Sequence, residues 1–73
     1  MNRITVDPDI CNGKPVIKGT RITAQTVLEF LGAGESIEDV LEEYPSLNRD
    51  DVLECMKFSS ELMKHSFVLQ EVV

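Results

Sequence analysis

The densest signature in the chain lies at residues 13–22, which read Gly13-Lys14-Pro15-Val16-Ile17-Lys18-Gly19-Thr20-Arg21-Ile22. The proline fixes one backbone angle and stops a helix from running through this stretch. The β-branched pair Val16-Ile17 suits a short strand. Lys18-Gly19 suits a tight turn, because glycine accepts the positive φ that a type II turn requires. We expect residues 20–22 to run back as a second strand, so the stretch predicts a small β-hairpin.

Three amphipathic helices are predicted after this hairpin, near residues 23–33, 36–44 and 48–65. Each begins at a residue whose side chain can cap the free amides of the first turn, namely Thr23, Ser36 and Asn48. Apolar residues recur at helical spacing and form one stripe in each helix. The stripes are Ala24, Val27, Leu28 and Leu31, then Ile37, Val40, Leu41 and Tyr44, and then Val52, Cys55, Met56, Ser59, Leu62 and Met63.

The two ends of the chain add shorter features. Residues 3–6 alternate apolar and polar side chains, which predicts a short strand. Residues 66–73 hold five apolar residues in eight, so they form either a last strand over the core or a segment that binds a partner. We therefore expect one mainly α domain over residues 1–73. It is a three-helix, helix-turn-helix-like bundle of the homeodomain-like or winged-helix-like kind, with a hairpin arm at 1–22 and an apolar tail at 66–73.

Charge is distributed unevenly along a chain whose net charge is −6. Residues 1–28 hold four bases and two acids, whereas residues 29–73 hold three bases and eleven acids, so these parts carry +2 and −8. Phosphate binding should therefore begin in the N-terminal part. The candidate DNA-binding residues are Lys14, Lys18, Arg21 and Arg49, with Arg3 assisting.

The third helix lies where a helix-turn-helix protein would read the major groove. Its first residues include Arg49 but also three carboxylates, on Asp50, Asp51 and Glu54. A surplus of carboxylates is unfavourable against a phosphate-lined groove. We favour a helical hairpin that serves packing over a helix that reads DNA bases.

Few residue types suited to catalysis or metal binding are present. The spacing of Cys11 and Cys55 fits no zinc motif, and His65 is the sole histidine, so we expect both cysteines to be small core residues. We predict no enzyme activity, no metal and no cofactor.

No apolar run is long enough to span a bilayer and the N-terminus lacks a signal-peptide core, so we expect a cytoplasmic protein that does not bind membranes. A homodimer is expected because so short a chain buries little core.

The motifs also resemble a known family. Asp7-Pro8, Ile10 and residues 13–22 resemble the opening of the domain of unknown function 433 family, and the match continues through Leu28, Gly34-Glu35-Ser36, Tyr44-Pro45, Leu47 and Asp51-Val52. The chain departs from the family pattern at Asp7, Asn12 and Thr23, where His, a second Gly, and Pro or Val are common.

This resemblance implies a helix-turn-helix-like fold and an antitoxin that neutralises a PIN-like ribonuclease toxin and also binds its own operator DNA. In that role Phe67, Val68 and Leu69 would anchor the toxin. Two alternatives stay open: a stand-alone DNA-binding regulator, or a self-associating interaction module.

Overall fold

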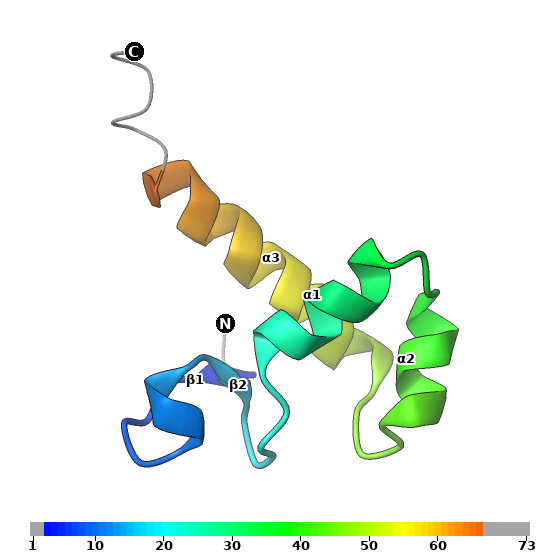
Figure 1. Cartoon of the computed structure of the whole chain (residues 1–73), viewed down its shortest axis with the longest axis horizontal. Helices are drawn as coiled ribbons and strands as arrows, with labels where there is room; N and C mark the ends of the chain where they lie inside the picture. Colours follow the sequence, from blue (N-terminus) through cyan, green and yellow to red (C-terminus); the bar gives the residue numbers. More distant parts are fainter. Residues whose placement is uncertain (1–2, 67–73) are drawn as a thin grey trace.

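The structure is a computed structural model that describes residues 3–66 (Figure 1). In chain order its elements are β1 (Ile4–Thr5), a short 3-10 turn (Cys11–Gly13), β2 (Val16–Ile17), α1 (Ala24–Gly32), α2 (Ile37–Glu43) and α3 (Arg49–Ser66). The predicted fold class is confirmed: the chain is mainly helical, with three helices in a helix-turn-helix-like arrangement and a short antiparallel strand pair near its N-terminus. The observed helix ends agree with the predicted ones to within one residue.

The three predicted caps explain this agreement. The Thr23 hydroxyl accepts a hydrogen bond from a first-turn backbone N–H of α1 at 3.0 Å. Ser36 and Asp39 form a reciprocal capping box at α2, with bonds of 3.1 and 3.0 Å. The Ser36 backbone N–H and hydroxyl hold the pKa of Asp39 below its ordinary value. Asn48 and Asp51 form the same reciprocal pattern at α3, with bonds of 3.0 and 2.9 Å.

The strand that pairs with β2 differs from the predicted one. β2 pairs antiparallel with β1, while the returning residues 20–22 form no strand. The predicted turn does form, with Gly19 at φ +83° and the Thr20 N–H bonded to the Ile17 carbonyl at 2.9 Å. However, the Thr20 hydroxyl accepts the Ile22 N–H at 3.0 Å, so this N–H does not bond to the neighbouring strand as a regular β-ladder would require. The return is reduced to a single bridge between Val16 and Thr23.

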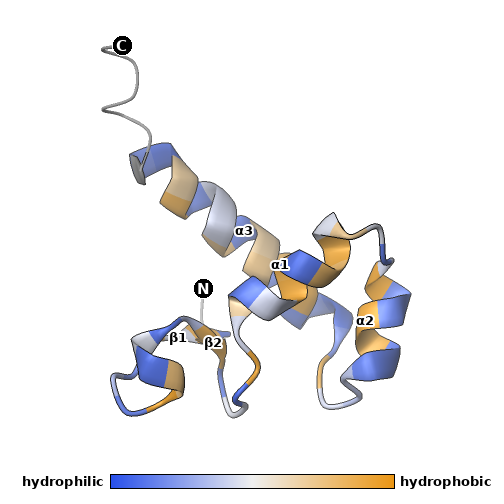
Figure 2. Ribbon diagram, viewed as in Figure 1, coloured by the Kyte–Doolittle hydropathy of each residue, from blue (hydrophilic) through white to orange (hydrophobic). Residues whose placement is uncertain are grey.

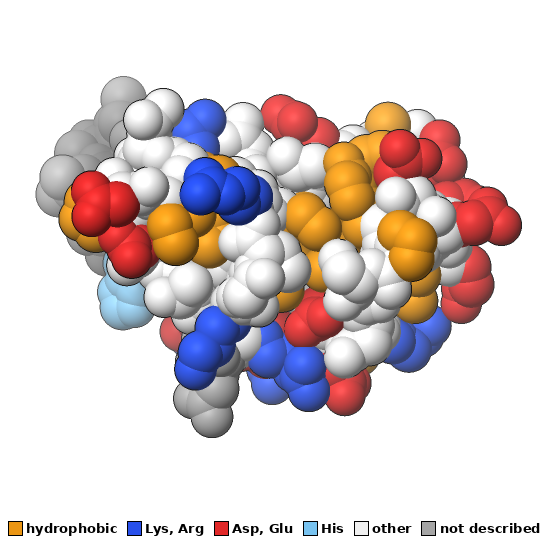
Figure 3. All heavy atoms as spheres, turned by 90° about the horizontal axis from the view of Figure 1, so that it is seen from below, with side chains coloured by type: hydrophobic (Ala, Val, Ile, Leu, Met, Phe, Trp, Pro, Cys, Tyr) orange, Lys and Arg blue, Asp and Glu red, His pale blue; other side chains and the backbone are white. Residues whose placement is uncertain are grey.

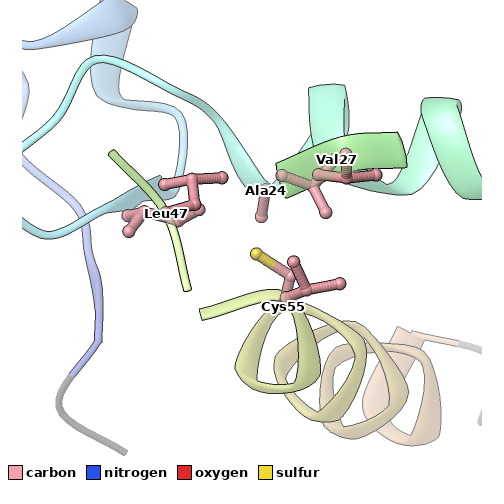
Figure 4. Close-up of a cluster of buried hydrophobic side chains, with 7 residues drawn as sticks. Ala24, Val27, Leu47 and Cys55 are labelled. Atoms are coloured by element: carbon pink, nitrogen blue, oxygen red, sulfur yellow. The ribbon is translucent and has the colours of Figure 1, made fainter. Parts of the chain in front are cut away.

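Small side chains make up the core. Cys55 of α3 points toward Ala24 and Val27 of α1, and Leu47 from the α2–α3 connection belongs to the same cluster (Figure 4). The buried apolar residues are Val16, Ile17, Ala24, Val27, Val40, Leu47, Val52 and Cys55. In Figure 2, orange segments of α1 and α2 mark the residues that close this core.

An aromatic pair supplements the core at one end of the bundle. Phe30 of α1 and Tyr44, which follows α2, meet edge to face with ring centroids 5.7 Å apart. Such pairs add to the stabilisation that burial alone provides. The stripe predicted for α1 did not include Phe30, because this ring packs at the flank of the helix toward α2 rather than toward α3.

An ion pair joins the N-terminus to α3. Arg3 Nη1 donates to Asp51 Oδ1 at 3.0 Å, and Arg3 also lies 3.6 Å from the Asp50 carboxylate. The Arg3 carbonyl accepts the Lys18 N–H at 2.7 Å. Arg3 was among the predicted phosphate contacts, but its guanidinium binds these two carboxylates instead. In the structure Asp51 is only 7% exposed, so Arg3 serves the packing of β1 against α3.

We predict that Asp51→Ala lowers the free energy of unfolding by about 1.5–3 kcal/mol, because it removes both a helix cap and the partner of Arg3. The matched control is Asp50→Ala, since the Asp50 side chain is 71% exposed and its ion pair is longer. That control should cost less than about 1 kcal/mol. Urea unfolding followed by circular dichroism measures both changes, and equal losses would contradict the assignment.

Candidate functional site

A basic surface lies on the loops of the N-terminal part. Lys14, Lys18 and Arg21 are all exposed, as predicted for solvent-facing cations. Between residues 3 and 66, none of the ion pairs involves any of the three. Figure 3 shows most of the basic side chains on this face toward the N-terminal strands. Within residues 3–66, the charges of these three cations are therefore not offset by an ion pair.

An unusual turn positions the first of these cations. Cys11, Asn12 and Gly13 have consecutive positive φ angles of +51°, +60° and +80°. Glycine adopts this region freely and asparagine tolerates it, but cysteine rarely does. The Cys11 thiol donates to the Arg21 carbonyl at 3.4 Å and so joins the turn to the loop that carries Arg21. Cys11 is therefore a half-buried loop residue, and the prediction that it lies in the core was wrong.

A polar recess separates this turn from α1. Its walls include Asn12 and Lys14 on one side and Thr26 and Glu29 on the other. The ammonium and the carboxylate are opposite in charge, so the recess favours neither an anion nor a cation. We assign it no ligand.

Arg49 has a different environment from the other predicted DNA contacts. Its guanidinium lies 3.2 Å from the Glu38 carboxylate of α2, and both side chains are well exposed. The next two residues of α3, Asp50 and Asp51, are held by Arg3. The charged side chains at the start of α3 thus already form ion pairs within the protein. Arg49 does not lie with the loop cations Lys14, Lys18 and Arg21.

An acidic face covers the outer side of α2. Glu38, Asp39, Glu42 and Glu43 are all exposed, and acidic side chains gather at the α2 end of the molecule in Figure 3. The Ser36 capping box and the Glu38–Arg49 pair both hold the first turn of this helix. The carboxylates therefore sit on a preorganised helix.

The remaining candidate groups are dispersed. In the described part of the chain, no three His, Cys, Asp or Glu side chains lie close enough together to hold a metal. Cys55 is buried, and burial raises the pKa of its thiol to about 11, with smaller contributions from the charges of Asp51 and Glu54. His65 lies in the last turn of α3 with Lys64, where cations suit the carbonyl end.

None of the helices described is long and apolar enough to cross a membrane. The predicted anchor Phe67, Val68 and Leu69 lies outside the described residues.

The fold and these surfaces define a small helix-turn-helix-like protein with a basic N-terminal arm and an acidic helical face. A family model described as "Protein of unknown function (DUF433)" matches residues 4–59, and the chain belongs to this family. The resemblance drawn from the sequence is thereby confirmed.

Two similar proteins extend this finding. The chain is 41% identical over 49 residues to "Uncharacterized protein y4eO" of Sinorhizobium fredii, a match that covers 67% of this chain and 22% of that protein. The crystal structure of a DUF433 member protein from Anabaena variabilis superposes with a TM-score of 0.79 at 26% identity, covering 84% of this chain and 60% of that one. The chain thus spans only part of either relative.

We predict that a disulfide reagent at about pH 8 modifies Cys11 and leaves Cys55 unmodified in the folded protein. The thiolate is the reactive form, and the raised pKa and burial of Cys55 keep it protonated and enclosed. In denaturant both thiols should react. Absorbance of the released thiol counts the sites, and rapid modification of Cys55 without denaturant would contradict the described core.

Proposed function

We propose that this protein is an antitoxin that binds and neutralises a PIN-like ribonuclease toxin, with the acidic face of α2 occupying the toxin's RNA groove. The observation that carries the proposal is the cluster of exposed carboxylates on two turns of one capped helix. The family resemblance supplies the class of partner. A groove that binds RNA is basic, so a rigid row of carboxylates complements it as RNA phosphates do.

Preorganisation supports this role for α2. A seven-residue helix is about 10 Å long, so its exposed carboxylates lie close together. Glu38 is paired with Arg49, so Asp39, Glu42 and Glu43 supply the negative charge of this patch. The capping box and the Glu38–Arg49 pair hold that patch before any partner arrives. A patch that is already ordered loses little conformational entropy when it binds.

Electrostatic complementarity raises the association rate more than the affinity, so a second contribution is needed. In our proposal Phe67, Val68 and Leu69 supply it, because aromatic and aliphatic anchors dominate binding energies. The acidic face would then guide the approach, and the apolar tail would hold the complex.

We predict that Glu42→Gln combined with Glu43→Gln slows association with the toxin by about tenfold at low salt and barely changes dissociation. The matched control removes the same charge elsewhere, through Asp9→Asn combined with Glu61→Gln. Surface plasmon resonance with a purified PIN-like ribonuclease measures both rates. Equal slowing by the two double variants would show that net charge, rather than the α2 face, controls association.

Truncation after Ser66 tests the anchor in the same experiment. Dissociation should accelerate sharply while association stays nearly constant, because the acidic face is retained. Thermal melting of the truncated chain is the control for folding. A folded, truncated chain that neutralises the ribonuclease with unchanged rates would remove the tail from the mechanism.

A second candidate function, DNA binding, is favoured by the exposed loop cations. Lys14, Lys18 and Arg21 could each neutralise a phosphate, and binding of this kind positions a protein without reading bases. Any binding should therefore be weak and sensitive to salt.

We predict that replacing Lys14, Lys18 and Arg21 together by Ala flattens the dependence of DNA affinity on salt. Each phosphate contact contributes a slope of about −0.9 in log affinity against log salt concentration. Arg49→Ala is the control, because Arg49 is already paired with Glu38. Fluorescence anisotropy with a duplex measures the slope. Loss of binding in the Arg49 variant alone would restore α3 as the reading helix.

A further inference from the structure

The C-terminal half of α3 extends beyond the rest of the molecule (Figure 1). We call residues 57–66 the overhang; they span about 15 Å of helix. Leu62 and Met63 belong to the apolar stripe predicted for this helix, but they are 54% and 55% exposed. Blue and orange residues alternate along the overhang in Figure 2. Apolar periodicity thus continues past the point where the chain's own core ends.

A groove lies where the overhang leaves the bundle. One wall consists of Pro15 with Ala24 and Leu28 of α1, and the other consists of Phe58 and Leu62 of α3. The groove holds about 380 Å³ and its exposed lining is almost entirely apolar. Glu29 lies on its rim. An apolar groove beside an exposed apolar helix is typical of an interface.

We propose that this groove and the overhang form a homodimer interface, in which the α3 helices of two copies run antiparallel and each overhang covers the groove of the other. A two-fold axis through the paired helices makes the contact reciprocal, as closed dimers require. Each Leu62 would then reach into the groove between Leu28 and Phe58 of the second copy.

Two features of the chain select a second copy as the occupant. First, the apolar groove and the exposed apolar end of the helix lie on one surface. Leu62 belongs to both of them. Second, the charges complement each other in trans. Residues 29–56 hold nine acids and one base, for −8, whereas the overhang holds two bases and one acid, for +1. An antiparallel pairing brings each overhang to the acidic body of the other copy, including Glu29 on the groove rim.

The size of the core supplies the energetic reason. The buried cluster consists largely of Val, Ala and Cys, which bury less apolar area than Leu or Phe. A domain of this length buries only about 60% of the surface that its unfolded chain exposes. Covering Phe58, Leu62 and Leu28 with a second copy would extend the core across the interface.

The test is sedimentation velocity of the full chain, alone, from about 1 to 100 µM. We expect a dimer, and we expect Leu62→Glu to raise its dissociation constant at least about thirtyfold, as for a central apolar anchor. The matched control is Leu53→Glu, since Leu53 is 39% exposed on the same helix. Nine residues separate it from Leu62, which puts it half a turn away, about 180° around the helix. That variant should stay dimeric.

Two results would overturn the proposal: a monomeric wild-type chain at the highest concentration, or dissociation of the dimer by Leu53→Glu with no effect of Leu62→Glu. Circular dichroism and melting of each variant show whether it is folded. A variant that unfolds is replaced by Leu62→Ser, which removes the anchor without adding charge. Since no toxin is present, failure here leaves the proposed antitoxin function untouched.

Discussion

The Asp51 carboxylate holds together parts of the chain that local patterns leave separate. One of its oxygens accepts the Asn48 N–H at the start of α3, and the other accepts the Arg3 guanidinium from the N-terminal strand. A buried carboxylate is costly unless its oxygens are hydrogen-bonded, and both oxygens of Asp51 are. The same contacts fix the first turn of α3 and place β1 against it. Together with the packing of Val52 and Cys55 in the core, these contacts hold the start of the long helix in place.

The surface of the molecule divides into regions that differ in charge and polarity. The loops near β2 present cations, α2 presents carboxylates, and the far end of α3 presents apolar side chains. The core between them is thin, so caps and ion pairs contribute much of the specificity of the arrangement. Three surfaces of different chemistry therefore lie on one small domain.

The helices were predictable from sequence because Thr23, Ser36 and Asn48 mark their starts and apolar stripes mark their faces. The partner of β2 was not, because the outcome depends on where one hydroxyl, that of Thr20, directs its hydrogen bonds. The Arg3–Asp51 and Arg49–Glu38 pairs join separate elements, so no local pattern indicates them. Periodicity identified Leu62 and Met63 as apolar positions but could not tell whether the chain itself covers them. The sequence likewise identified the cations of the candidate sites, but it could not tell which of them form ion pairs. The structure shows that Arg3 and Arg49 do.

The ion pair between Arg3 and Asp51 also sets an order for folding during synthesis. These residues are 48 positions apart, so the first strand leaves the ribosome long before its partner on α3. Contacts of this separation form late, because a long loop must close first. β1 can pair early with β2, which lies close to it in the chain, whereas the contact between Arg3 and Asp51 has to wait for α3. The N-terminal strand is therefore tied to α3 only once the first turn of α3 has formed around Asp51.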